Sequence, residues 1–203
     1  MNDISKLTLS DEEQQLVNNS NWILTKRVIV EKVYHLFGNL SAVIGSAVEK
    51  ETWLPLPVVR STGKISRGEN YRLLPYVLLD HPRCFDTENI FAVRTMFWWG
   101  NFFSITLQLS GTYKKMFEDK LSKNIKGLRA NEFYLCINED QWQHNFDEDN
   151  YIAVNQLTDE ETGSHIRQKP FIKLAVKLPL DRWNEMPVLL ERSFFTILEL
   201  LRY

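Results

Sequence analysis

The sequence is poor in the residues that build metal centres, disulfide frameworks and phosphate-binding loops. Its 203 residues include two cysteines, Cys84 and Cys136, and neither stands in a CxxC pair or in a Cys/His cluster with metal-ligand spacing. The eight glycines form no GxGxxG and no GxxxxGK[ST] motif, and neither HExxH nor GxSxG occurs. The common signatures of zinc, nucleotide and serine-nucleophile chemistry are therefore absent. We expect no metal and no cofactor.

Long apolar runs and an excess of one charge are also missing. No stretch approaches the 18 apolar residues of a membrane span, and the first residues lack a basic segment followed by an apolar one. We therefore expect a cytoplasmic protein that makes no membrane contact. The 24 Lys and Arg residues are balanced by 26 Asp and Glu residues, a formal net charge of -2. This balance argues against nucleic acid as a dedicated partner, because such binding depends on excess positive charge.

Hydrophobic residues make up 44% of the chain, enough for one ordinary globular domain. At this length folding removes roughly 70% of the extended-chain surface from water. The fold can therefore be stabilised by packing alone, without a disulfide or a metal.

Helices are predicted at both ends of the chain. Ser10 and Glu13 have the spacing of a capping box, so a short helix begins there. Apolar residues spaced by three, four and seven then predict a second helix over 22–50, and this stripe includes Ile23. Gly38 and Gly45 each weaken that helix by about 1 kcal/mol relative to alanine, which points to a bend or to close helix packing. A last amphipathic helix covers 185–202.

The middle of the chain is rich in predicted strands. Prolines and glycines predict an extended loop over 52–70, and strands follow at 76–80, 90–99, 102–110, 132–137, 151–157 and 171–178. The first of these strands is expected to end at His81, and a helix covers 112–127. Alternation in the last strand places Lys173 and Lys177 on a solvent-facing side. The acidic residues of 139–161 indicate a solvated loop.

We therefore predict the α+β class, with one domain over residues 1–203. An antiparallel sheet carries helices on one face. Residues 1–50 form the helical N-terminal region, 51–180 the sheet-rich region and 181–203 the C-terminal helix.

Arg94 is the most unusual residue of the predicted sheet. If Gly100 and Asn101 form a two-residue hairpin turn, Trp99 pairs with Phe102 and Arg94 with Leu107. This register places Arg94 on an apolar face, and the opposite face mixes aromatics with hydroxyls. An unpaired guanidinium there costs several kcal/mol. Arg94 must therefore reach solvent, form a salt bridge with Asp80 or Glu69, or bind an anionic ligand.

A second group of candidates lies in the segment 60–72, which carries four basic residues against Glu69 alone. Arg67, Asn70 and Tyr71, with Arg94, are the candidate ligand-binding residues, because guanidinium and amide groups donate to phosphate or carboxylate oxygens. Glu69 and His81 are the candidate acid/base residues. A charged turn that binds no ligand accounts for the same pattern.

The segment 112–129 carries six basic residues against two acidic ones. It is either a weak nucleic-acid contact, a solvated helix face, or a surface that meets an acidic segment of the same protein.

The stretches KISRGENYRLLPYVLLDHPRCF and FAVRTMFWWGNFFSITLQLSG resemble segments of a family of small, uncharacterised bacterial proteins of about this length. The resemblance covers the central segments better than the termini. It implies a bacterial cytoplasmic origin, and it transfers no activity and no catalytic residue.

Three hypotheses follow. The first is a non-enzymatic module that binds a partner protein or a small ligand through 64–72 and the mixed sheet face as a homo-oligomer, with Trp99 and Phe102 exposed. The second is an enzyme that acts on a small phosphate- or carboxylate-bearing substrate, which requires Arg67, Glu69 and Arg94 to converge on one cleft. The third is weak nucleic-acid binding through the lysine-rich helix. Whether the chain is an enzyme is left open.

Overall fold

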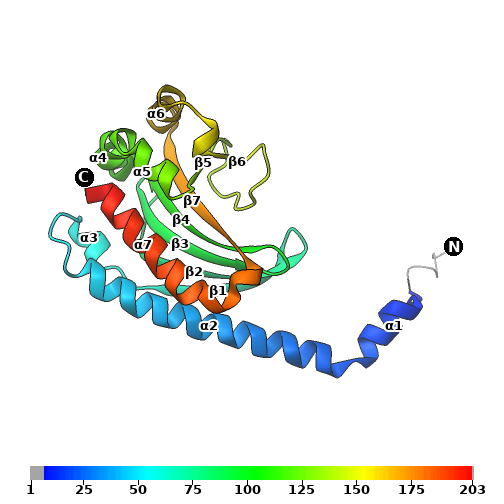
Figure 1. Ribbon diagram of the computed structural model, residues 1–203. Coiled ribbons are helices and arrows are strands. Elements are labelled where there is room, and N and C mark those ends of the chain that lie inside the picture. The colour runs from blue at the N-terminus through cyan, green and yellow to red at the C-terminus, as the bar shows by residue number, and fades with distance from the viewer. Residues whose placement is uncertain (1–6, 203) are drawn as a thin grey trace.

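A seven-stranded antiparallel sheet forms the centre of the molecule (Figure 1), and the computed structural model describes residues 7–202. The strand order is β1-β2-β3-β4-β7-β5-β6. The strands are β1 (Lys64–Tyr71), β2 (Leu74–Phe85), β3 (Ile90–Trp98), β4 (Phe102–Ser110), β5 (Tyr134–Cys136), β6 (Tyr151–Ala153) and β7 (Phe171–Pro179). The α+β class and the antiparallel sheet predicted from the sequence are confirmed.

Two long helices, α2 (Ser20–Val48) and α7 (Met186–Arg202), pack on one face of this sheet (Figure 1). The remaining helical segments are α1 (Asp11–Asn18), α3 (Leu56–Val59), α4 (Gly111–Lys123), α5 (Ile125–Ala130), α6 (Asp159–Gln168), η2 (Val154–Gln156) and η3 (Leu180–Glu185). The N-terminal and C-terminal helices were predicted close to their observed bounds. The capping box at α1 is also confirmed, because Ser10 and Glu13 bond to each other's backbone N–H.

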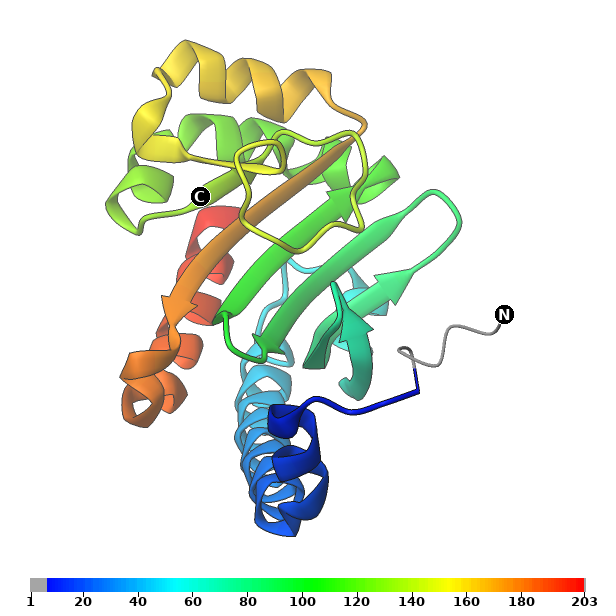
Figure 2. The same cartoon turned by 90° about the vertical axis from the view of Figure 1, so that its right-hand side faces the viewer.

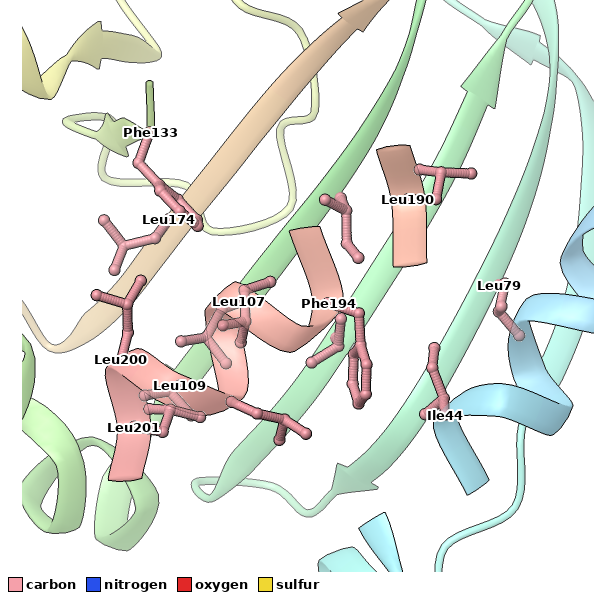
Figure 3. Packing of buried hydrophobic residues seen from close by; sticks show 14 of the residues in the cluster. Ile44, Leu79, Leu107, Leu109, Phe133, Leu174, Leu190, Phe194, Leu200 and Leu201 are labelled. Atoms are coloured by element: carbon pink, nitrogen blue, oxygen red, sulfur yellow. The ribbon is translucent and has the colours of Figure 1, made fainter. Parts of the chain in front are cut away.

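The main core lies between these helices and the sheet. Figure 3 shows Phe194 of α7 and Ile44 of α2 directed toward Leu79 of β2 and Leu107 of β4, and all four side chains are buried. The sequence reaches this arrangement because alternate strand residues and every third or fourth helix residue are apolar. One face of the sheet is therefore buried in the hydrophobic core.

The hairpin of β3 and β4 differs from the predicted register by one residue. Trp98 pairs with Phe102, so the connection has three residues, and Gly100 adopts the positive φ of 70°. Arg94 then pairs with Thr106 rather than Leu107. Because side chains alternate along a strand, this slip transfers every residue of β4 to the other face.

The predicted apolar face with a lone arginine was therefore wrong. Arg94 lies on a polar face that it shares with Thr106 and Gln108 of β4. The apolar residues of both strands share the face beneath the helices: Phe91, Val93, Phe97, Phe103, Ile105, Leu107 and Leu109.

Three further expectations were wrong. Residues 64–71 form a strand rather than part of a loop, and β2 continues past His81 to Phe85, with a register shift between Asp80 and Arg83. The acidic segment contains α6, which begins at Thr158 with a second capping box closed by Glu161. The Thr-x-x-Glu spacing of this box was present in the sequence.

Residues 137–150, which we call the strap, connect β5 to β6 and cross the sheet face opposite α2 and α7 (Figure 2). Buried polar side chains of the sheet lie beneath the strap, and they form the candidate functional site.

Candidate functional site

Side chains from four neighbouring strands form a buried polar cluster beneath the strap. Asp80 of β2 pairs in register with Arg94 of β3, and Arg94 pairs with Thr106 of β4. Two residues along, Gln108 of β4 pairs with Lys173 of β7. Because directly paired residues share a face, all five point toward the strap. Four of them are less than 10% exposed, and the Arg94 side chain is 11% exposed.

Arg94 is held by a fork of hydrogen bonds. Its Nε donates to Asp80 Oδ1 at 2.7 Å and its Nη2 donates to Asp80 Oδ2 at 3.0 Å. The salt bridge to Asp80 that the sequence suggested is therefore confirmed. The third guanidinium nitrogen, Nη1, lies 3.1 Å from Nε2 of His144 in the strap. A guanidinium has no acceptor, so Nε2 accepts this bond and the imidazole is neutral.

The state of His144 follows from its surroundings. Desolvation beneath the strap lowers the pKa of the imidazole well below its usual value, and the nearby charges of Lys173 and Arg94 lower it further. A neutral imidazole is the form that can accept from Arg94. At neutral pH, His144 is therefore in the form that bonds the strap to Arg94.

Lys173 is the residue that sequence reasoning missed. Its side chain is 1% exposed, contrary to the expected solvent-facing position, because the strap covers this part of β7. Its Nζ donates to the backbone carbonyl of Gln143 and lies 5.4 Å from the centre of the Tyr151 ring. Burial lowers the pKa of the ammonium to about 8. Strand alternation places Lys173 correctly, but no local signal shows that a distant loop covers it.

The strap is fixed at both of its ends. Lys169 donates to the backbone carbonyls of Ile137 and Asn138 at 2.5 and 3.1 Å. Near the other end, Phe146 stacks on Tyr151 with a ring-centre distance of 4.6 Å. Between these ends, the polar groups of the cluster bond to Gln141, Gln143 and His144 of the strap. Arg94, Lys173 and Gln108 therefore act as a structural latch in this conformation.

Tyr71 connects the strap to the edge of the sheet. Its Oη accepts from the backbone N–H groups of His144 at 2.7 Å and Asn145 at 3.1 Å, and it donates to Asn145 Oδ1 at 3.2 Å. One phenol therefore satisfies three polar groups of the strap.

Replacing Tyr71 with phenylalanine is expected to lower the free energy of unfolding by about 2 kcal/mol, because two strap N–H groups lose their acceptor. Hydrogen exchange should accelerate at the amides of His144 and Asn145. Tyr76→Phe is the matched control, since its hydroxyl lies against Gly68 rather than the strap. Equal effects of the two variants on these amides would contradict this role of Tyr71.

The other candidate residues do not converge with Arg94. Arg67 pairs with Val77, which faces the helices, so it projects from the opposite side of the sheet. Glu69 is exposed and pairs with Lys26 of α2 at 2.5 Å. Asn70 is exposed on β1. The clamp of Arg67, Glu69 and Arg94 on one anion is therefore not formed. Of the candidates, only Tyr71 shares a partner with Arg94.

His81 lies on the helix side as well. It is 6% exposed, its Nδ1 lies 2.8 Å from Ser41 Oγ of α2, and burial lowers the pKa of its ring. Gly45 of α2 stands against the same ring, so the close packing expected at this glycine is observed. His81 is thus embedded between β2 and α2, away from Glu69 and Arg94.

The aromatic residues near the hairpin turn also differ from expectation. Phe102 was expected to be exposed, but it is 3% exposed and packs against Trp98 and Phe146. Trp99 is half-buried, and its ring meets Trp22 of α2 edge to face at 6.2 Å. The predicted docking surface at this turn is therefore filled largely by the chain itself.

Half of the basic residues of 112–129 are already bonded within the protein. Lys114 bonds to Glu118 and to the carbonyl of Arg167, Lys120 bonds to the carbonyl of Arg202, and Arg129 pairs with Asp159 at 2.8 Å. Of these contacts, the pair of Arg129 with Asp159 joins the basic segment to the acidic one, as one of the three alternatives expected. Within residues 7–202, no group of three or more His, Cys, Asp or Glu side chains is placed to hold a metal. No helix in that range is long and apolar enough to cross a bilayer.

A different surface is apolar, and no part of the described domain buries it. We call it the N-terminal surface, and it consists of apolar residues of α1 and the first turns of α2, each 45–69% exposed: Leu16, Val17, Trp22, Ile23, Leu24 and Val28. None of the described residues 7–29 is buried. Ile23, which was expected on the buried stripe, is exposed. Part of the signal was visible in the sequence, because Leu24 and Val28 fall off the helical stripe, whereas Ile23 continues its spacing.

The chain also has a shallow hollow on the outer side of the helix layer. It has a volume of about 470 Å³ and lies between α2 and α7, where it is lined by Ala42, Val43, Ser46, Ala47, Lys50, Glu51 and Phe195. Phe195 is 39% exposed at its edge.

Comparison of the chain with protein-family models, with curated proteins and with solved structures gives no match. The resemblance of the central segments to a bacterial family therefore stays a prediction.

Proposed function

We propose that this protein is a non-catalytic interaction module that associates with a second copy of itself through the N-terminal surface. The observation that carries the proposal is the helical segment 11–29, in which no side chain is buried. This differs from the sequence hypothesis in the surface used, since the segment 64–72 is now part of a strand and the hairpin turn is largely covered.

Helix energetics support the need for a partner. An isolated helix shorter than about 12 residues is marginal in water, and most helical stability comes from packing of an apolar face. The helix α1 has eight residues and stands clear of the sheet (Figure 1). Its apolar residues Leu16 and Val17 find no core within the domain. A second protein surface supplies the missing contact.

A second copy fits because one chain carries both halves of a contact. The N-terminal surface offers large apolar side chains, and the hollow beside Ala42 and Phe195 offers small residues and an exposed ring. Both are exposed on helices of the same chain. Contiguous exposed apolar surface of this kind marks interaction sites in soluble proteins.

We expect the full chain to be a dimer in light scattering at micromolar concentration, and Leu24→Glu to weaken the dimer about 30-fold. The leucine is 56% exposed, so its replacement leaves the domain core intact while it places a charge in an apolar contact. Met116→Glu on α4 is the matched control, because Met116 is 51% exposed outside the N-terminal surface. A strictly monomeric natural chain would overturn the proposed function.

A further inference from the structure

The exposed face of α2 carries a regular stripe. Its members follow spacings of four and three residues, and all of them are exposed: Leu24, Val28, Glu31, His35, Gly38 and Ala42. The spacing is that of the positions by which two helices pack along each other, and they are filled here by two large apolar residues, an acid, a histidine and two small residues. The opposite side of α2 is buried against the sheet through Val33, Phe37 and Ile44. One helix therefore has two faces with helical periodicity, and only one of them is used within the domain.

Gly38 is the second observation. A glycine in the interior of a helix costs about 1 kcal/mol relative to alanine. A Cβ added at Gly38 would meet no atom within 4 Å, so nothing within the described chain requires the glycine. By contrast, Gly45 lies against His81. A helix interior keeps a glycine where another backbone or side chain approaches closely.

We infer that the second copy binds with its α2 antiparallel to the first, centred between Glu31 and His35, so that large residues of one copy meet small residues of the other. This inference rests on the proposed function and specifies its geometry. In a two-fold arrangement each contact occurs twice. The contacts between the copies are Leu24 with Ala42, Val28 with Gly38, and Glu31 with His35.

Charge complementarity decides the direction. In the antiparallel arrangement, Glu31 of each copy lies beside His35 of the other, so an acid meets a base twice. A parallel arrangement would place Glu31 beside Glu31, and two carboxylates at close range are unfavourable. Within one chain, Glu31 pairs with Arg27 at 3.2 Å on an exposed face, and such a pair contributes little. It therefore leaves Glu31 available to the second copy.

The position of the hollow is consistent with the same pairing of the two α2 helices. Pairing of Leu24 with Ala42 brings the first turn of one α2 over the hollow of the other copy, so the exposed Trp22 and Ile23 approach Phe195. The stripe and its flanking residues extend over roughly 40 Å of helix. A contact of that length covers on the order of 800 Å² per copy, the amount typical of a specific dimer.

The test exchanges the charges at the centre. Glu31→Lys alone and His35→Glu alone should each weaken the dimer about tenfold in sedimentation velocity, because the first removes the acid–base contact twice and the second places two carboxylates together twice. The double variant Glu31→Lys/His35→Glu should restore the natural dissociation constant in an antiparallel pair. In a parallel pair each residue faces its own copy in the natural chain and in every variant, so the double variant would show no compensation of the single changes. Restoration therefore supports the inference, and failure of restoration overturns it.

A second variant tests the close approach. Gly38→Leu should abolish the dimer at concentrations where the natural chain is dimeric, while the melting temperature of the diluted monomer stays the same or rises, because the leucine points into open space. Gly38→Ala should weaken the dimer less. A dimer that tolerates Gly38→Leu and both charge changes but is lost in Leu24→Glu would overturn the antiparallel geometry and leave the proposed function standing. A monomeric natural chain would overturn both.

Discussion

Replacement of Asp80 with alanine is expected to lower the free energy of unfolding by about 3–5 kcal/mol. The carboxylate accepts two hydrogen bonds from Arg94, and both side chains are about one-tenth exposed. Removal of one partner leaves a charge buried without compensation, and this costs far more than the intact pair contributes. Denaturant unfolding followed by tryptophan fluorescence measures the loss.

The double variant Asp80→Leu/Arg94→Met separates the pair from the rest of the cluster. It removes both charges and keeps the volume, so most of the stability lost in Asp80→Ala should return. The hydrogen bond to His144 is the part that does not return. A loss below about 1 kcal/mol for Asp80→Ala would show that water reaches the guanidinium. The role of Arg94 in holding the strap would then be wrong.

The second large effect is the pH dependence that Lys173 imposes. Burial lowers the pKa of its ammonium to about 8 in the folded chain, whereas an unfolded lysine titrates near pH 10.4. Between these values the unfolded chain binds the extra proton. The free energy of unfolding therefore rises with pH across this range, by about 3 kcal/mol from this residue, and the gain is lost as pH falls through 8.

Lys173→Met isolates the contribution of this residue. Burial raises the pKa values of Cys136 and Tyr151, so these groups lower stability as pH rises and oppose the lysine. The difference in stability between the natural chain and Lys173→Met cancels most of their effect. We expect the stability of the methionine variant relative to the natural chain to fall by about 3 kcal/mol between pH 7 and pH 10.5. A difference that does not change with pH would mean that the ammonium is solvated.

Much of the fold could be predicted from local pattern. The capping box at Ser10, the apolar stripe that ends at Val48 and the alternation of 171–178 are signals within a few residues, and each produced the expected element. The salt bridge from Arg94 to Asp80 was also within reach, because a buried guanidinium needs a carboxylate and Asp80 was a close candidate.

The register of the hairpin shows where such reasoning fails. A turn of two residues and a turn of three differ by one position, and Gly100 with Asn101 fits either. The error moved Thr106 and Gln108 away from Arg94 and created an apolar face that does not exist. The better guide was the requirement that both strands bury their apolar residues on the same side.

The candidate site depended on contacts that are distant in sequence. Lys173 and Gln143 are thirty residues apart in the chain, and no local pattern in either segment indicates that they meet. Burial by a long irregular loop is a property of the assembled fold. The N-terminal surface, in contrast, was readable from the sequence, because Leu24 and Val28 are apolar where the buried stripe requires nothing.

The positions of β1 and β6 at the two ends of the strand order determine how this protein can and cannot polymerise. An uncovered strand edge is a template for adding another chain, and proteins protect such edges with charges, irregularities or very short strands. Here β6 has three residues, and β1 carries Lys64, Arg67 and Glu69 and shifts register between Gly68 and Tyr71. Growth through the sheet is disfavoured at both ends, whereas the two-fold contact that we propose on the helical side would close after two chains instead of extending into fibres.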